Sequence, residues 1–273
     1  MSTATTPRAP RRTRAQILFG FVGWEFWRNF RMVDATFFII VLPVAMYLMF
    51  GVAMGVEGAR AGEGNVAAYV MTSMAAYGAV IATTAMAGSA AVERTQGWGR
   101  QLNLTGLTPP AYMLGKMLMA VLMAITPIVL VYLAGLVTGA ELDSVGLWLS
   151  SAALVLLVAV PFSLYGLAFA LLFRSETAVS AASGFLVIFA FFGNLFIPLS
   201  GVLLEIARFT PLYGVAMLAR WPQTEGMIVP MSEEEAMAGI EYESMWVLLV
   251  NLGAWTLIFA VVCLLAARRR TSR

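Results

Sequence analysis

The sequence predicts an all-α integral membrane protein with six transmembrane helices. An interfacial amphipathic helix precedes the first, and short external re-entrant helices lie between the fifth and the sixth. The 273 residues are 60% hydrophobic and only 12% charged, whereas soluble domains are about 25% charged. The mean hydropathy of +0.84 leaves too little polar surface for water to be the solvent. Six stretches without Asp, Glu, Lys or Arg are long enough to cross a hydrocarbon core about 30 Å thick.

The N-terminal region is basic and then amphipathic. Residues 1–14 contain four arginines and the two prolines Pro7 and Pro10, and we expect a disordered cytoplasmic tail. Residues 15–33 are expected to form a helix in the membrane interface, because Glu25, Arg28 and Asn29 share one face while aromatic residues supply rings at the headgroup level. The charges of Glu25 and Arg28 interrupt the apolar stretch and argue against a secretory signal.

The six spans form one permease domain over residues 34–268. The second span is rich in small residues, which is typical of a helix packed tightly against other helices. Pro127, Pro161 and Pro198 fall inside spans and predict kinks. The expected spans are Ala35–Val56, Gly64–Val92, Met117–Ala140, Ser144–Phe173, Thr177–Leu204 and Ser244–Ala267.

The basic residues between the spans indicate the orientation. With the N-terminus inside, fourteen of the 17 Lys and Arg lie on the cytoplasmic side, and only Arg60, Arg208 and Arg220 lie outside. We therefore expect a multi-pass protein of the cell (inner or plasma) membrane with both termini cytoplasmic, ending in a basic tail at residues 269–273. Lys116 begins the third span, where we expect its ammonium group to reach lipid phosphates in preference to a binding role.

Two connections are longer than a simple reversal of the chain requires. Between spans two and three, Trp98 and Leu102 stand one turn apart in a polar, helix-like stretch that ends at Gly106 and Pro109. A docking surface and a membrane-surface loop with an interfacial tryptophan both account for it. Between spans five and six, residues 205–220 are apolar and broken at Pro211, which predicts two short helices that dip into the outer leaflet.

These two connections also carry a resemblance. The first holds Glu93-Arg94, then Gly97, Leu102, Leu104, Thr108-Pro109 and Gly115-Lys116; the second holds Phe196-Ile197-Pro198-Leu199-Ser200-Gly201, then Ile206-Ala207, Thr210-Pro211-Leu212-Tyr213 and Ala219-Arg220. In order and spacing they resemble the membrane (permease) subunits of type-2 ABC exporters, of the drug-resistance permease kind. The pair Gly97 and Gly99 departs from that pattern and weakens any helix around Trp98.

The resemblance implies partners and residue roles. Two permease chains, a second copy or a related chain, would pair, and each would dock an ATP-binding cassette subunit on the cytoplasmic face. The contact with that subunit would use Glu93, Arg94, Trp98, Arg100, Leu102 and Leu104, flanked by Glu25 and Arg28 of the N-terminal helix. The external gate would contain Pro198, Glu205, Arg208, Pro211 and Tyr213.

The sequence argues against an enzyme. Lys116 is the only lysine, and Gly115-Lys116-Met117 lacks the Ser or Thr of a phosphate-binding P-loop, so ATP and Mg²⁺ are expected in the partner subunit. Without histidine, with the single cysteine Cys263, and with Asp34 and Asp143 on opposite sides of the membrane, no catalytic constellation and no metal site can be drawn. Nothing predicts a nucleic-acid partner.

The expected substrate is a hydrophobic or amphiphilic compound, a drug, antibiotic or lipid, moved outward. Candidate path residues are Met46, Met71, Phe189, Phe192 and Asn194, since Met and aromatic surfaces suit adaptable binding. For any one of them, contact with lipid or a neighbouring helix is the more common role. Export of a polysaccharide or lipid-linked glycan is the alternative. An ion- or proton-coupled secondary transporter is the alternative of another class, although such proteins usually place ionisable residues within their spans, and these six have none.

Overall fold

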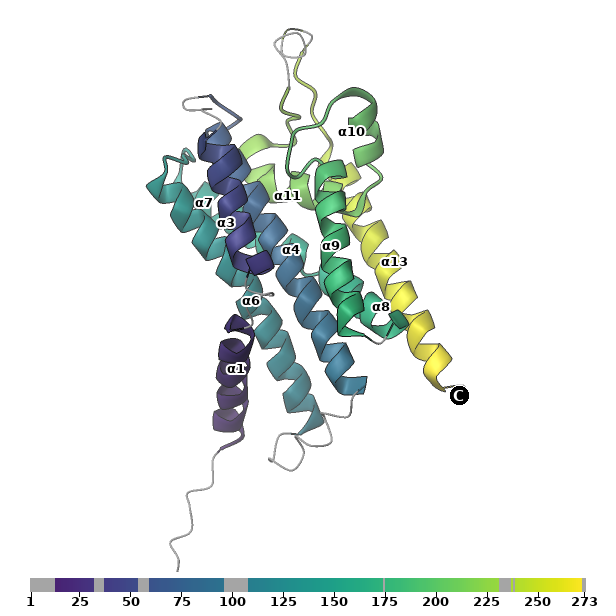
Figure 1. The fold of residues 1–273 in the computed structure, drawn as a ribbon. Coiled ribbons are helices and arrows are strands. Elements are labelled where there is room, and N and C mark those ends of the chain that lie inside the picture. The colour runs from purple at the N-terminus through teal and green to yellow at the C-terminus, as the bar shows by residue number, and fades with distance from the viewer. Residues whose placement is uncertain are drawn as a thin grey trace, which may run out of the picture.

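The computed structural model describes residues 13–31, 37–53, 59–95, 108–173, 175–230, 237 and 239–271. Regular structure in these residues is helical, with three isolated β-bridges between loop residues and no strand, so the predicted all-α class is confirmed for them. The helices form an elongated bundle (Figure 1).

The bundle is built around one central helix. Helix α4 (Val66–Thr95) is in contact with α6 (Pro109–Val137), α7 (Val145–Ala159), α8 (Phe162–Phe173), α9 (Glu176–Phe192) and α11 (Pro211–Thr224). The helix Phe37–Ala53 packs on it as well; its middle is α3 (Leu42–Tyr47), between π-helical segments at Phe37–Val41 and Leu48–Ala53. The small residues of α4 allow this packing, as predicted.

Glycine permits one especially close approach to the central helix. A Cβ atom at Gly166 of α8 would lie 2.0 Å from the carbonyl oxygen of Thr84 in α4. The Oγ1 of Thr83, one residue earlier, donates a hydrogen bond of 2.9 Å to the carbonyl oxygen of Ala159 at the end of α7. The backbones of α4 and α8 are therefore in direct contact.

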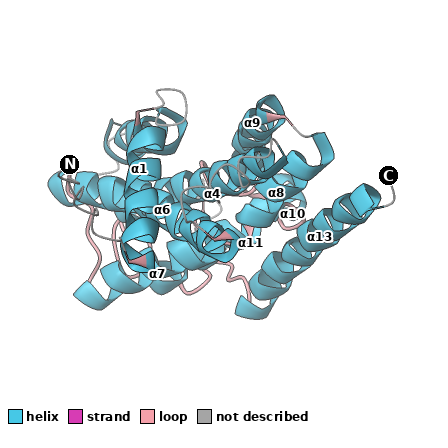
Figure 2. Ribbon diagram, turned by 90° about the horizontal axis from the view of Figure 1, so that it is seen from below, coloured by secondary structure: helices cyan, strands magenta, loops and turns pink. Residues whose placement is uncertain are grey.

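The C-terminal helix lies at the edge of the bundle. Helix α13 (Met245–Thr271) packs mainly on α8 and α11, and in the view from below it stands apart from the central helices (Figure 2). Only 17% of the 18-residue apolar stretch that makes α13 a candidate span is buried, whereas 89% of the corresponding stretch of α4 is buried. The predicted sixth span began at Ser244 and ended at Ala267; the helix continues to Thr271, into the predicted basic tail.

By length and composition, four of the described helical segments, or five if a bent pair is one span, are candidates to cross a membrane. Four helical segments are long and apolar enough to cross a membrane, namely Val66–Glu93, Leu114–Val137, Val145–Phe173 and Met245–Ala266. Helices α10 (Gly201–Ala207) and α11 would add a fifth if they form one span, but they meet at 97°. Phe37–Ala53 and Thr177–Phe192 are shorter apolar helices. The count of six stays a prediction.

Two predicted boundaries are wrong. The third span was expected from Met117, but α6 begins at Pro109, because proline is favoured in the first turn, where its missing N–H is not needed. The fifth was expected to reach Leu204, but α9 ends at Phe192. Asn194 has φ 58°, and its side-chain oxygen accepts the backbone N–H of Leu199, so the chain leaves the helix there and Pro198 lies in no helix.

The predicted proline kinks have different outcomes. Pro161 marks the break between α7 and α8, whereas Pro127 lies inside the continuous helix α6.

The two ends of the bundle are distinct. We call the end that holds α1 (Arg14–Phe30), Glu93 and Lys116 the α1 end; the C-terminal end of α13 lies towards it as well (Figure 1). The opposite end holds α10 and the loops between helices, and we call it the α10 end. The first and the last described helices, α1 and the C-terminal part of α13, therefore lie towards the same end of the bundle (Figure 1).

Candidate functional site

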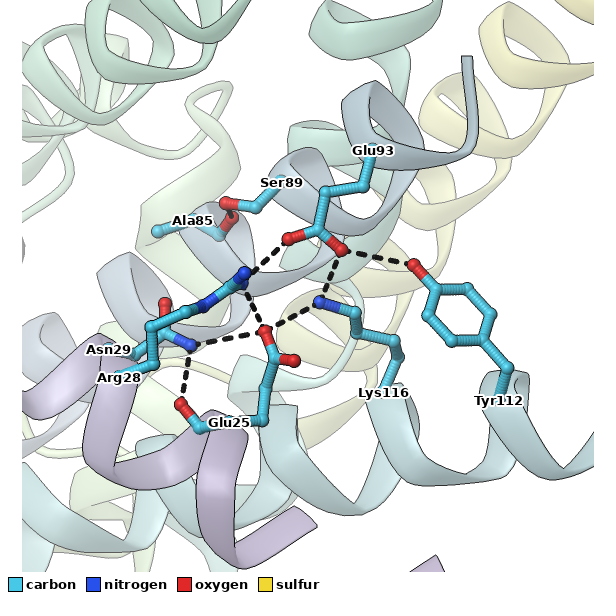
Figure 3. Close-up of polar contacts among 8 residues, drawn as sticks. All are labelled: Glu25, Arg28, Asn29, Ala85, Ser89, Glu93, Tyr112 and Lys116. Carbon is cyan, nitrogen blue, oxygen red and sulfur yellow. Dashed lines mark hydrogen bonds and ion pairs between the residues drawn. The ribbon is translucent and has the colours of Figure 1, made fainter. Parts of the chain in front are cut away.

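A buried ion-pair cluster joins α1, α4 and α6 at the α1 end. The Nζ atom of Lys116 lies 2.8 Å from Oε1 of Glu25 and 2.6 Å from Oε2 of Glu93 (Figure 3). The three side chains are 10%, 3% and 13% exposed, respectively. One ammonium group thus pairs with carboxylates from two other helices, in a place that is largely buried. We call Glu25, Arg28, Glu93, Tyr112 and Lys116 the junction.

Arg28 completes the charge balance of the junction. Its Nη2 atom lies 2.7 Å from Oε1 of Glu93 and also pairs with Oε1 of Glu25. The hydroxyl of Tyr112 donates a 3.0 Å hydrogen bond to Glu93. Burial and the neighbouring Glu93 carboxylate raise the pKa of Tyr112, so the phenol stays protonated and remains a donor. Two acids and two bases therefore compensate one another.

Local sequence explains how α1 reaches this position. Its start is fixed by a capping box, in which Thr13 and Gln16 bond each other's backbone N–H groups. Glu25 and Asn29, one turn apart, face the protein and are buried. Gly115 of α6 lets α1 approach, because a Cβ atom there would lie 2.7 Å from the ring of Phe21.

The other face of α1 is aromatic and exposed. Phe19, Trp24 and Trp27 are all more than half exposed, and the guanidinium of Arg28 lies 5.3 Å from the ring centre of Trp24. Glu25 and Asn29 are thus on the side of α1 that is turned towards α4 and α6. That this helix lies in the membrane interface stays a prediction.

The junction brings together some of the predicted contact residues. Glu25, Arg28 and Glu93 meet, although up to 68 positions separate them in the sequence. Residues 96–107 lie outside the described residues, and with them the predicted contacts Trp98, Arg100, Leu102 and Leu104; the side chain of Arg94 is not described either. The Glu93–Lys116 pair nevertheless links the helix that precedes this segment to the helix that follows it.

The preferred interpretation of Lys116 as a lipid-directed side chain is wrong. Its ammonium group is turned into the protein and satisfied by two carboxylates. Exposure to lipid headgroups would have required a free path to the interface, which Glu25 and Glu93 occupy. A buried lysine calls for an acidic partner, and both acids were present in the sequence at the same predicted membrane side.

A second charged cluster lies at the bend between α10 and α11. Arg208 Nε lies 2.7 Å from Oε2 of Glu243, and the hydroxyl of Tyr213 donates to the same oxygen at 2.7 Å. Arg208 also pairs with Glu205. Three predicted gate residues are thus in one network, and Pro211 starts α11 directly after the bend.

Sequence reasoning missed the residues that hold this bend from α13. Nδ2 of Asn251 donates to the carbonyl oxygens of Arg208 and Thr210 at 2.8 and 3.1 Å, and Nε1 of Trp255 donates to that of Phe209 at 3.1 Å. In the sequence, Asn251 stands as a polar residue within the apolar stretch of the predicted sixth span. Its position one turn before Trp255, both donors on one face, is the signal that could have been used.

The predicted substrate-path residues do not line one surface. Met71 and Asn194 are buried inside the bundle, whereas Phe192 is exposed on α9. Met46 and Phe189 are half-buried and pack against the core. Within one chain these five residues therefore share no described pathway, and their role stays a prediction.

Comparison with known proteins identifies relatives of the chain. A family model described as "ABC-2 family transporter protein" matches residues 58–268. The chain is also similar to the "Putative transport permease YvfS" of Bacillus subtilis (strain 168), at 24% identity over 192 residues, which cover 67% of this chain and 77% of that protein. The family match includes Glu93, Lys116 and the whole bend between α10 and α11, but begins after α1.

Proposed function

The chain belongs to the ABC-2 family of transporter proteins, and from this premise we propose that it is the permease of an ATP-driven exporter of hydrophobic or amphiphilic compounds. A drug, an antibiotic or a lipid would be moved outward. The energy would come from a separate ATP-binding cassette subunit, which would hold ATP and Mg²⁺, while a second permease copy or a related chain would complete the membrane part. The complex would lie in the cell membrane, with the α1 end in the cytoplasm.

The junction is the observation that carries this proposal. Residues 96–107 would receive the ATP-binding subunit, and the chain on both sides of this segment is held by ion pairs between Glu93 and Lys116. Glu25 adds α1 to the same unit. Because buried, compensated charges resist separation, a push on the segment would move α1, α4 and α6 together. Since α4 contacts most of the bundle, the movement would reach the α10 end.

The surface supports an apolar or amphiphilic substrate. The four helical segments that can cross a membrane contain few ionisable residues. Two of these, Glu93 and Lys116, are paired with each other in the junction. The aromatic, aliphatic and methionine side chains of these segments suit contact with the apolar part of such a substrate.

The proposal is tested with the permease and its ATP-binding partner purified together in nanodiscs. Amphiphilic drugs should stimulate ATP hydrolysis, and Trp98→Ala or deletion of residues 96–102 should remove the stimulation while leaving basal hydrolysis by the partner. Trp246→Ala is the matched control, because this exposed tryptophan lies at the start of α13. Stimulation by a lipid-linked glycan and by no drug would indicate polysaccharide export. Transport driven by an ion gradient without ATP would refute the exporter.

A further inference from the structure

Arg220 is the largest side chain that is fully buried in the described residues, with an exposed fraction of 1%. The sequence predicts that Arg220 lies outside the membrane, in the connection after the fifth span. The structure places it in α11, turned into the bundle towards α4. A cation this far from solvent needs an explanation, because ionisable groups inside a membrane domain are costly and usually functional.

The contacts of the Arg220 guanidinium are all with neutral groups. Nη2 donates to the carbonyl oxygen of Asn194 at 2.8 Å and lies 3.5 Å from the sulfur of Met217, and Nη1 donates to Oγ of Ser73 at 3.2 Å. The carbon Cζ lies 4.2 Å from the ring centre of Tyr69. None of the described carboxylates forms an ion pair with it.

Two buried hydrogen-bond donors, one of them on Arg220 itself, have no acceptor in the described residues. Nε of Arg220 is buried without an acceptor, and so is the hydroxyl of Tyr77. Tyr77 follows Tyr69 and Ser73 at helical spacing on α4, so these three residues share the face of α4 that Arg220 contacts. The ring of Tyr77 packs edge-on against Phe196 at 4.7 Å. Arg220 thus carries one open donor against this face of α4, and Tyr77, one turn beyond Ser73 on the same face, carries a second.

We propose that Arg220 binds the acidic headgroup, a carboxylate or phosphate, of an amphiphilic substrate. The guanidinium fork matches such anions in two parallel hydrogen bonds, and the negative charge would compensate the buried cation. The Tyr77 hydroxyl would donate to the same headgroup, and Phe196 would contact the apolar part. In the conformation described α11 covers the guanidinium, so the headgroup enters when α11 separates from α4. This inference rests on the proposed function.

The test compares amphiphiles with one chain length and different headgroups. The permease complex in nanodiscs of neutral lipid is titrated with dodecyl phosphate, dodecanoate and the uncharged dodecyl glucoside, and ATP hydrolysis is followed. The two anions should reach half-maximal stimulation at a concentration about tenfold lower than the glucoside, as a charge-assisted hydrogen-bond pair implies. The stronger of the two identifies the headgroup as phosphate or carboxylate.

Substitutions separate a binding role from a structural one. Arg220→Gln should abolish the anion preference and leave the response to the glucoside, and Arg220→Lys should keep part of the preference. Tyr77→Phe keeps the ring and the buried charge, and should weaken the response to the anions alone. Arg60→Gln, which removes an exposed cation paired with Asp143, is the control and should retain the full preference.

Each outcome decides a different statement. If no amphiphile stimulates the wild-type complex, the exporter proposal itself fails. If anions and glucoside act equally on the wild type, or if Arg220→Gln keeps the preference, the headgroup site is refuted. If Arg220→Gln does not assemble, Tyr77→Phe decides, and an unchanged anion preference in that variant overturns the inference.

Discussion

Lys116→Met tests the junction directly. The substitution keeps the length and packing of the side chain but removes the ammonium group, whose Nζ lies 2.8 Å from Glu25 and 2.6 Å from Glu93. Two nearly buried carboxylates then share the single cation Arg28, with one negative charge uncompensated. Removing one partner of a buried ion pair costs about 3–5 kcal/mol. Because Arg28 remains in place, we expect the lower end, about 3 kcal/mol, as a loss in the free energy of unfolding.

The double variant Lys116→Met/Glu93→Gln gives the decisive comparison. It removes one acid together with one base, so Glu25 and Arg28 remain as a balanced pair, and stability should recover by about 1–2 kcal/mol relative to Lys116→Met. Both variants are measured by thermal unfolding of the purified permease complex and by the ratio of stimulated to basal ATP hydrolysis. The single variant should lose that ratio even at temperatures where it is folded.

Two results would contradict this reasoning. If Lys116→Met unfolds at the wild-type temperature, the ion pairs are not formed as described. If the double variant is destabilised by the sum of the two single effects, the charges do not interact. Arg60→Met is the matched control, because this cation is paired with Asp143 at an exposed position. This variant should unfold at the wild-type temperature.

Two further predictions concern the packing of α8 and the bend at the α10 end. Gly166→Ala should sharply reduce the yield of monodisperse protein in size-exclusion chromatography, because the new Cβ would lie 2.0 Å from the Thr84 carbonyl oxygen. Gly184→Ala is the control and should match the wild type, since nothing lies within 4 Å of a Cβ atom at that position. Equal yields of the two variants would refute the close contact. Tyr213→Phe should lower the free energy of unfolding by about 1 kcal/mol by removing its 2.7 Å hydrogen bond to Glu243, and an unchanged thermal midpoint would show that this bond contributes nothing.

The composition of the chain predicted its helical class but not where every helix ends. The spans were predicted from the absence of charged residues. The stretch after Phe192 is uncharged as far as Leu204, although residues 193–200 are not helical and a separate short helix, α10, starts at Gly201. Gly193 and Asn194 were the available stop signal, because both residue types favour the end of a helix. At Pro109 the opposite error arose, since proline was treated only as a terminator although it also starts helices.

The junction shows which part of a site the sequence can predict. The resemblance to type-2 ABC permeases predicted Glu25, Arg28 and Glu93 as contact residues, because a local motif can be recognised from the order of residues alone. Their contact with Lys116 depends on how α1 packs against α6, which no local pattern specifies. Arg220 is the same case: a charge in a loop-like connection was assigned to solvent, but α11 folds back and buries it against α4.

The burial of α4 has a consequence for how the protein is made. This helix has the lowest mean hydropathy of the four segments able to cross a membrane, and protein covers almost all of it. Yet α6, α8, α9 and α11, which cover it, are all synthesised later. A nascent chain that ends after Thr95 would expose to lipid the hydroxyls of Thr72, Thr83 and Thr84, which are buried in the finished bundle. The polar groups of α4 are therefore shielded from lipid only by helices that follow it in the chain.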